Sequence, residues 1–106
     1  MQGPYPILDI DTYVTPDSIG SYILSRGSNA AHYVGRSDTD LNSRLKSHRG
    51  TGYVSFWFEL ASSPLEAFYS ECDLYHKYNP QDNEMHPTAP PMASWKCPVP
   101  GCKRSI

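Results

Sequence analysis

Two short runs of alternating apolar and polar residues, 21–25 and 32–35, predict a β-hairpin in the first third of the chain. The loop between them, residues 26–30, contains glycine and asparagine, which readily adopt the backbone angles of a turn. A later run, residues 53–60, is rich in aromatic and β-branched residues and is the clearest strand of the sequence. We expect it to lie beside the hairpin as a central or third strand.

Helical signals predict two helices. The first follows residues 37–40, whose side chains are typical N-caps, and Leu41 and Leu45 then recur at one-turn spacing as a buried stripe. The second helix covers residues 65–78, after two serines and a proline that are typical of a helix start. It ends before the Asn-Pro pair at 79–80. Each helix therefore has one face available to pack on the sheet.

The two ends of the chain have weaker patterns. Residues 7–14 alternate between flanking prolines, and this pattern leaves an edge strand and an ordered arm as equal choices. Residues 80–101 contain six of the ten prolines and no helical period, so we expect an irregular tail, and Trp95 indicates that it packs back on the domain. The whole pattern predicts an α/β protein of the α+β type, with a three-stranded antiparallel sheet flanked by helices. Its predicted parts are an N-terminal arm or edge strand at 1–19, a domain at 20–83 and a Pro/Cys tail at 84–106.

Composition limits the class of protein. A chain of 106 residues can form one domain with a modest core. The apolar runs are too short to span a membrane, and the first residues lack the basic and apolar parts of a signal peptide, so we expect a cytoplasmic protein with no membrane partner. Three cysteines cannot all pair within the chain, which favours thiols or metal ligands in a reducing compartment.

The net charge of −2 is unusual for a nucleic-acid-binding protein, which normally has a basic surplus. The charge is unevenly distributed, because residues 26–49 carry five basic and two acidic side chains, a local charge of +3. A weak basic face is therefore compatible with the sequence, with modest non-specific affinity for nucleic acid that salt would reduce steeply.

Several polar side chains should meet at the rim of the predicted hairpin. Tyr22 and Tyr33 lie on its two strands, and Arg44 and His48 lie four residues apart, beside the buried leucine stripe. Glu71 projects from the apolar face of the second helix, where a carboxylate is costly to bury unless it is paired or bound to a cation. Each residue also has a structural explanation: the tyrosines as packing residues, Arg44 and His48 as a solvated helix edge, and Glu71 as an ion-pair partner of Arg44.

The order of these residues resembles the GIY-YIG nuclease family, in its small bacterial single-domain type. The matching elements are Gly20-Ser-Tyr22, Tyr33-Val-Gly35, Arg36, Leu41-x-x-Arg44-x-x-x-His48, Glu71 and Pro80-Gln-Asp-Asn83. Either tripeptide alone is weak evidence, but six elements in the right order over residues 20–83 are strong evidence. Arg36 is a departure, since many members carry lysine there, and a guanidinium does not transfer protons.

The resemblance implies a divalent-metal-dependent endonuclease that hydrolyses DNA phosphodiester bonds. Glu71 would hold Mg²⁺ or Mn²⁺, with water and a phosphate oxygen as the remaining ligands. Tyr22 or Tyr33 would be the general base. Since a phenol with a pKa of about 10 is rarely ionised at neutral pH, its pKa must be lowered, and Arg36 beside Tyr33 and the metal are the available cations.

Three further roles follow from the same resemblance. Arg44 would neutralise charge on the phosphate, His48 would orient a tyrosine or protonate the leaving oxygen, and Asn83 would steady the site through hydrogen bonds. RNA is the alternative substrate, and a protein partner would supply specificity that so small a domain lacks. Two other functions remain open: a non-catalytic, zinc-stabilised module that binds nucleic acid or protein on the same fold, and a zinc-stabilised interaction domain with no nucleic-acid role.

The cysteines predict a structural zinc site in the tail. Cys72 and His76 are four residues apart on the second helix, and Cys97 and Cys102 form a Cys-x4-Cys knuckle, so the four can make a tetrahedral Cys3His site. His86 competes with His76 for the fourth position. The alternative is that Cys72 fills apolar space while the other two cysteines are thiols or form a disulfide.

Overall fold

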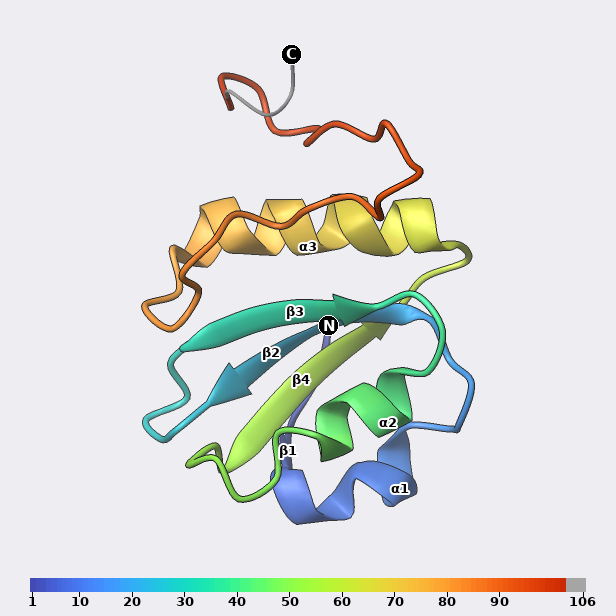
Figure 1. The fold of residues 1–106 in the computed structure, drawn as a ribbon. Helices are drawn as coiled ribbons and strands as arrows, with labels where there is room; N and C mark the ends of the chain where they lie inside the picture. The colour runs from blue at the N-terminus through green and yellow to red at the C-terminus, as the bar shows by residue number, and fades with distance from the viewer. Residues whose placement is uncertain (103–106) are drawn as a thin grey trace.

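The computed structural model describes residues 1–102 and contains a four-stranded antiparallel sheet between two layers of helices (Figure 1). The strand order is β1-β4-β2-β3, with β1 at Gln2–Pro6, β2 at Gly20–Ser25, β3 at Tyr33–Ser37 and β4 at Ser55–Leu60. Helix α3 (Pro64–Tyr78) lies along one face of the sheet, and the short helices α1 (Ile10–Tyr13) and α2 (Leu41–Lys46) lie on the opposite side (Figure 1).

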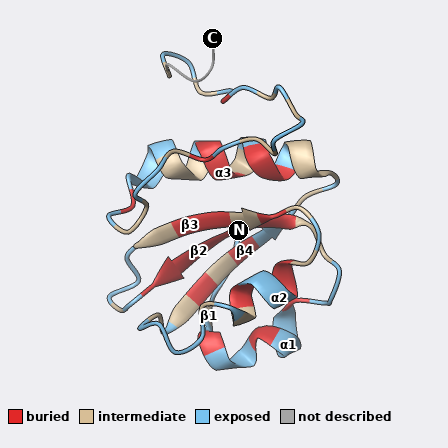
Figure 2. Cartoon of the chain, viewed as in Figure 1, coloured by how far each residue is buried: buried red, intermediate tan, exposed pale blue. Residues whose placement is uncertain are grey.

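The predicted hairpin is confirmed as β2 and β3, which pair in antiparallel register with Tyr22 opposite Gly35. All six residues of β2 are buried because the strand has a neighbour on each side and helices on both faces (Figure 2). Tyr22 and Leu24 enter the main hydrophobic core with Leu45 of α2, whereas Ser21 points to the other face and hydrogen-bonds Ser70 of α3 at 2.6 Å. The central strand therefore connects the two helical layers.

The prediction of a three-stranded sheet is wrong, because the N-terminal residues add a fourth strand at the β4 edge. In β1, Tyr5 lies opposite Phe56 of β4. The alternating run at 7–14 is not this strand, since the 3-10 turn η1 (Ile7–Asp9) leads directly into α1. Because β1 contains Pro4 and Pro6, its sequence did not indicate a strand. An edge strand nevertheless tolerates proline, since one side of its backbone has no ladder partner.

Both helix starts agree with the predicted caps. The side chain of Asp40 accepts a hydrogen bond from Ser43 N at 3.2 Å at the start of α2, and Ser63 accepts one from Glu66 N at 3.2 Å at the start of α3. Each bond satisfies one of the backbone N–H groups that a helix leaves unpaired in its first turn. Helix α3 ends at Tyr78, where Asn79 adopts a left-handed conformation with φ of 45°.

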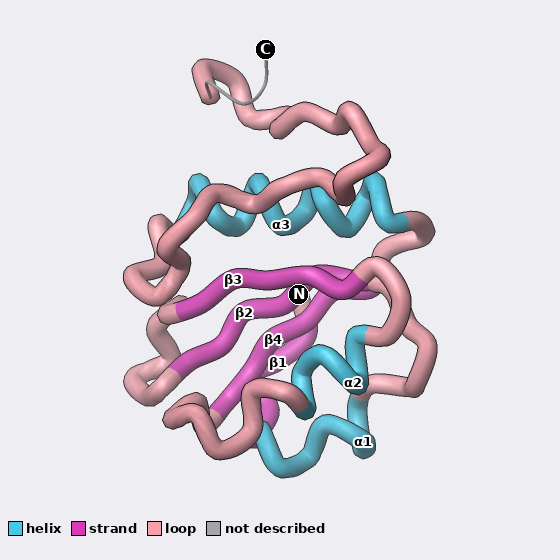
Figure 3. The backbone as a smooth tube through the Cα atoms, in the orientation of Figure 1, coloured by secondary structure: helices cyan, strands magenta, loops and turns pink. Residues whose placement is uncertain are grey.

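The described part of the tail after α3 contains neither helix nor strand. The tail nevertheless packs on α3, because the ring centroids of Trp95 and Phe68 lie 5.8 Å apart. Phe68, Cys72 and Cys97 form a second hydrophobic cluster. Figures 1 and 3 show the tail crossing in front of α3 and then turning back above the helix, on the side away from the sheet. Within residues 1–102, no helix is long and apolar enough to cross a membrane.

Candidate active site

A cavity of about 400 Å³ opens at the β3 edge of the sheet, between β3, α2, α3 and the loop that follows α3. Six of the seven side chains that were predicted to form the active site line this cavity: Tyr22, Tyr33, Arg36, Arg44, Glu71 and Asn83. Residues that are up to 61 positions apart in the sequence are thus brought to one opening by the sheet order and by the path of α3.

The seventh predicted residue, His48, lies behind the cavity in contact with both tyrosines. Its Nε2 atom lies 2.8 Å from the hydroxyl oxygen of Tyr22, at hydrogen-bond distance, and its ring centroid is 5.2 Å from that of Tyr33. Helix α2 ends at Lys46, but a following turn, in which His48 N donates to Leu45 O at 3.1 Å, keeps the imidazole one turn beyond the buried leucine.

Burial shifts the pKa values of Tyr22, Tyr33 and His48. It raises the pKa of Tyr22, which is 1% exposed, well above the ordinary value, and it raises the pKa of Tyr33 in the same direction. Burial and the charge of Arg44 lower the pKa of His48, so its imidazole is neutral at pH 7. The positive charge that partly offsets the rise at both tyrosines belongs to Arg44. The prediction that Arg36 lowers the pKa of Tyr33 is therefore wrong.

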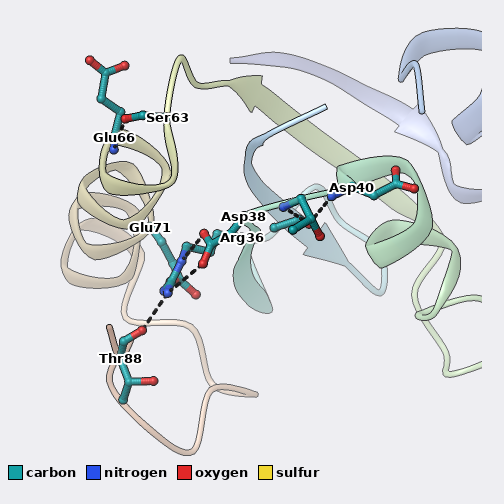
Figure 4. Close-up of polar contacts among 9 residues, drawn as sticks. Arg36, Asp38, Asp40, Ser63, Glu66, Glu71 and Thr88 are labelled. Atoms are coloured by element: carbon teal, nitrogen blue, oxygen red, sulfur yellow. Dashed lines mark hydrogen bonds and ion pairs between the residues drawn. The ribbon is translucent and has the colours of Figure 1, made fainter. Parts of the chain in front are cut away.

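Arg36 is instead held by three acceptors, as Figure 4 shows. Its Nη1 atom lies 2.7 Å from Glu71 Oε1, its Nε atom lies 2.9 Å from Asp38 Oδ1, and its Nη2 atom donates to the carbonyl oxygen of Thr88 at 2.8 Å. The guanidinium also lies over the ring of Phe68, 5.1 Å from its centroid. A guanidinium that is bound to three acceptors can orient the Glu71 carboxylate, but it is not free to bind another group.

Glu71 is the carboxylate that α3 presents to the cavity. It is 9% exposed, and burial raises its pKa while the hydrogen bond from Arg36 opposes that rise. The alternative ion pair of Glu71 with Arg44 does not form, because Arg36 takes that place and Arg44 is exposed at the cavity. One carboxylate beside an open cavity fits Mg²⁺ or Mn²⁺ chemically, since Mg²⁺ commonly keeps several waters and binds through one or two carboxylates plus phosphate.

Asn83 fastens the loop after α3 to the exposed edge of the sheet. Its side-chain oxygen accepts from Val34 N at 2.9 Å, and its amide nitrogen donates to Val34 O at 2.8 Å. The neighbouring Asp82 donates its backbone N–H to the carbonyl of His32 at 2.9 Å and accepts a hydrogen bond from the Tyr53 hydroxyl at 2.8 Å. The amide of Asn83 thus satisfies backbone groups of β3 that a further strand would otherwise pair.

Both motif glycines stand where a side chain would collide with a neighbour. A Cβ atom on Gly35 would lie 2.5 Å from the Cζ and hydroxyl oxygen of Tyr22, and one on Gly20 would lie 2.3 Å from the carbonyl oxygen of Glu59. The ring of Tyr22 therefore crosses the edge strand β3 at Gly35, and this crossing places its hydroxyl at the cavity beside His48. The sequence motif includes both glycines, but only the structure shows that a side chain at either position would collide with a neighbour.

Replacing Gly35 with alanine should displace Tyr22 and lower the free energy of unfolding by about 1–3 kcal/mol, because a methyl group there overlaps the phenol. Chemical denaturation of the two proteins measures the change. The matched control is the same substitution in a Tyr22→Leu background, where the overlapping ring atoms are missing and the cost should be much smaller. An equal cost in both backgrounds would show that the ring crossing is not what requires glycine.

The structure brings together a different zinc-ligand set from the predicted one. Four ligand atoms, from His76, His86, Cys97 and Cys102, lie within 4.8 Å of one another. Cys72 is not among them: it is 0% exposed and packs against Cys97 in the second hydrophobic cluster. Cys72 and His76 do lie one turn apart on α3, but His86 of the loop after α3, and not Cys72, shares the cluster with His76 and the two tail cysteines. None of the three cysteines is in a disulfide, so the alternative in which Cys97 pairs with Cys102 is not present.

Two groups at the site were not predicted. Asp38 follows Arg36 by two residues, which places both on the same side of an extended segment, and this spacing was a usable signal. The carbonyl oxygen of Thr88 is a backbone group in the irregular tail, for which the sequence contains no signal. Both groups act on Arg36, and they therefore determine how Glu71 is held.

Comparison with known proteins supports the fold. No protein-family model and no curated protein matches the sequence significantly. Among solved structures, the GIY-YIG N-terminal endonuclease domain of UvrC from Thermotoga maritima, bound to its catalytic divalent cation magnesium, matches with a TM-score of 0.60 at 24% identity over 72% of this chain and 92% of that chain. A mutant of that domain in which asparagine is changed to alanine matches with a TM-score of 0.61 at 23% identity over 74% and 93%. The fold expected from the resemblance in sequence is confirmed: this chain has the fold of a GIY-YIG endonuclease domain.

Proposed function

We propose that the protein is a divalent-metal-dependent endonuclease that hydrolyses DNA phosphodiester bonds, with RNA as the alternative substrate. The main support is that a tyrosine pair, an arginine and a buried glutamate line one open cavity at the edge strand. The solved domain with the same fold is an endonuclease domain that binds a catalytic divalent cation, magnesium. Since the domain offers little surface for reading bases, a protein partner would supply sequence or structure specificity.

Glu71 is the proposed ligand for Mg²⁺ or Mn²⁺. When bound, such an ion would stabilise negative charge on the phosphate and lower the pKa of water. The chain's own contribution is to hold the carboxylate at the cavity wall, where Arg36 bonds one oxygen at 2.7 Å and fixes its orientation. Asp38 and the Thr88 carbonyl keep Arg36 itself in place. The site is therefore organised before substrate arrives, as electrostatic catalysis requires.

Tyr22 is the proposed general base, with His48 as the group that makes this possible. A buried phenol with a raised pKa is rarely ionised, so direct loss of its proton to solvent is unfavourable. The neutral imidazole of His48 lies 2.8 Å from the Tyr22 oxygen and can accept that proton while Tyr22 takes one from the attacking water. The phenol then passes a proton along without becoming a stable phenolate. Tyr33 has a partly exposed ring at the cavity and is assigned a positioning role.

Arg44 is the proposed phosphate-binding residue. It is exposed on α2 and lines the cavity, whereas the guanidinium of Arg36 is occupied by carboxylates. A planar guanidinium can bond two phosphate oxygens and offset the charge that develops when water attacks. We expect Arg44→Ala to reduce metal-dependent cleavage of supercoiled plasmid by about a hundredfold.

The plasmid assay tests the proposed function as a whole. Wild-type protein is incubated with supercoiled or branched DNA and Mg²⁺ or Mn²⁺, and nicked and linear products are quantified over time. Arg49→Ala is the matched control, because Arg49 is also exposed beside α2 but does not line the cavity, and this variant should cleave at the wild-type rate. Wild-type protein that produces no metal-dependent cleavage on plasmid, branched DNA or RNA would refute the proposal.

A non-catalytic binding module on the same fold is the second candidate. One observation favours it: the carboxylate of Glu71 already has Arg36 as a partner, so its burial is explained without a metal ion. This candidate predicts nucleic-acid retention that falls with salt, without cleavage, and that is indifferent to Glu71→Gln.

A further inference from the structure

The His2Cys2 cluster, formed by His76, His86, Cys97 and Cys102, joins three parts of the chain. His76 lies in the last turn of α3, His86 lies in the loop after it, and the two cysteines flank a turn in the tail, where Cys102 N donates to Val99 O at 3.2 Å. These parts share no strand or helix, yet their ligand atoms meet within 4.8 Å. Such convergence of imidazoles and thiols is typical of a metal site.

Two distances within the cluster fit ligands of a single tetrahedral ion. Zinc holds nitrogen at about 2.0–2.1 Å and sulfur at about 2.3 Å, so tetrahedral ligands are roughly 3.3–3.8 Å apart. The Nε2 atoms of His76 and His86 are 3.2 Å apart, and the Sγ atom of Cys102 lies 3.4 Å from Nε2 of His86. These two pairs therefore have the spacing of a zinc coordination shell, and all four ligand atoms lie within 4.8 Å of one another.

The surroundings of the cluster prepare its atoms for a cation. Nδ1 of His86 lies 2.7 Å from the carbonyl oxygen of Pro87, to which it can donate only if it carries the proton, and Nε2 then faces the cluster with its lone pair. The sulfur of Cys97 is buried and has hydrogen bonds with the backbone of Val99 and the thiol of Cys72. Carbonyl acceptors behind a histidine and donors around a cysteine sulfur are common features of zinc sites.

We propose that one Zn²⁺ ion binds at the His2Cys2 cluster and fixes the C-terminal segment to α3. Two imidazoles and two thiolates suit zinc better than magnesium or calcium, which prefer oxygen ligands. Cys72 lies outside the coordination shell and supports the sulfur of Cys97. The proline-rich segment after α3 has no helix or strand in its described part, so a metal link replaces the backbone pairing that would otherwise hold it.

The zinc site also shapes the candidate active site, an inference that rests on the proposed function. His86 lines the cavity between Asn83, which clamps Val34, and Thr88, whose carbonyl accepts from Arg36. One ligand of the ion therefore lies in the middle of the loop that forms one wall of the cavity. Loss of zinc should loosen this wall and release one of the three acceptors that fix Arg36.

Metal analysis of the full chain, purified without added metal, tests the proposal without any cleavage assay. We expect about one zinc ion per chain, retained in Cys72→Ser and largely lost in both His76→Ala and Cys102→Ser. The variants distinguish the ligand sets, because a Cys3His site would lose zinc in Cys72→Ser as completely as in Cys102→Ser. That result would overturn the assignment, as would metal-free wild-type protein with reactive thiols or a disulfide between Cys97 and Cys102.

Two measurements on the wild-type chain require no variant to fold. Cobalt exchanged for zinc should give the absorption of a tetrahedral site with thiolate-to-cobalt charge transfer, whereas an oxygen-ligated ion would not. A chelator should lower the unfolding temperature by about 10 °C or more and increase amide exchange in residues 79–102. Unchanged exchange in that segment after zinc removal would overturn its bracing role. A protein that binds zinc as expected but cleaves no nucleic acid would refute the proposed function alone.

Discussion

Replacing Glu71 with glutamine should reduce metal-dependent cleavage by about a thousandfold or more, while the protein stays folded. Glutamine keeps the size of the side chain and an oxygen that can accept from Arg36, so the contact at 2.7 Å can persist. It removes the negative charge, which is what a divalent cation requires from this position. Because Arg36 keeps Asp38 and the Thr88 carbonyl as acceptors, we expect the free energy of unfolding to change by less than about 2 kcal/mol.

The plasmid assay with Mg²⁺ or Mn²⁺ measures this loss, and two further variants define its origin. Asp73→Asn is the matched control, because Asp73 is an exposed acid of the same helix that does not line the active-site cavity. Asp38→Asn tests the other carboxylate of the cavity, which should act through Arg36 and cost less than Glu71→Gln. Cleavage by Glu71→Gln within about threefold of wild type would remove Glu71 from the proposed site.

Elements that depend on local sequence were predictable, whereas those that depend on the path of the chain were not. The hairpin was predictable because its alternation and turn residues are local, and its register places Tyr22 opposite Gly35. The caps at Asp40 and Ser63 were predictable for the same reason. The strand β1 was not predictable, because its prolines are acceptable only at a sheet edge, and no local pattern shows which strand will be the edge.

In the candidate active site, too, the residues could be predicted from the sequence but their contacts could not. The order of tyrosines, arginine, histidine, glutamate and asparagine indicated that they belong together, and six of the seven now line one cavity. Their partners were not predictable: Arg36 pairs with Glu71 across 35 residues, and the Thr88 carbonyl comes from an irregular segment. Helical spacing correctly placed Cys72 near His76, but only the path of the chain after α3 decides whether Cys72 or His86 joins His76 and the two tail cysteines.

Replacing Tyr22 with phenylalanine should reduce cleavage by about a thousandfold, whereas Tyr33→Phe should reduce it by only about tenfold. The two rings are neighbours, with centroids 6.3 Å apart, so the variants are closely matched in location. They differ in the hydroxyl: that of Tyr22 lies 2.8 Å from Nε2 of His48, which can accept its proton. A larger loss in Tyr33→Phe than in Tyr22→Phe would assign the general base to Tyr33 and contradict the proposed relay.

The pH dependence of cleavage gives a second test of this relay. Its acceptor, His48, must be neutral, and burial together with Arg44 lowers its pKa below the unfolded value of about 6.5. Cleavage should therefore be maintained at pH 7 and fall only as the pH drops through the lowered pKa of His48. His48→Gln removes this titration, so its residual cleavage should lack that acid decline. An acid decline that persists unchanged in His48→Gln would show that another group causes it.

The same shift makes a prediction for stability, with a definite sign. Because folded His48 binds a proton less readily than unfolded His48, acid favours the unfolded state. The stabilisation is present above about pH 6.5 and is lost as the pH falls through that value toward the folded pKa. Urea denaturation of wild type and His48→Gln across this range isolates the effect, because both proteins keep His32, His76 and His86. The wild type should lose more stability than the variant as the pH falls, and parallel losses would mean that His48 is not held neutral between the tyrosines.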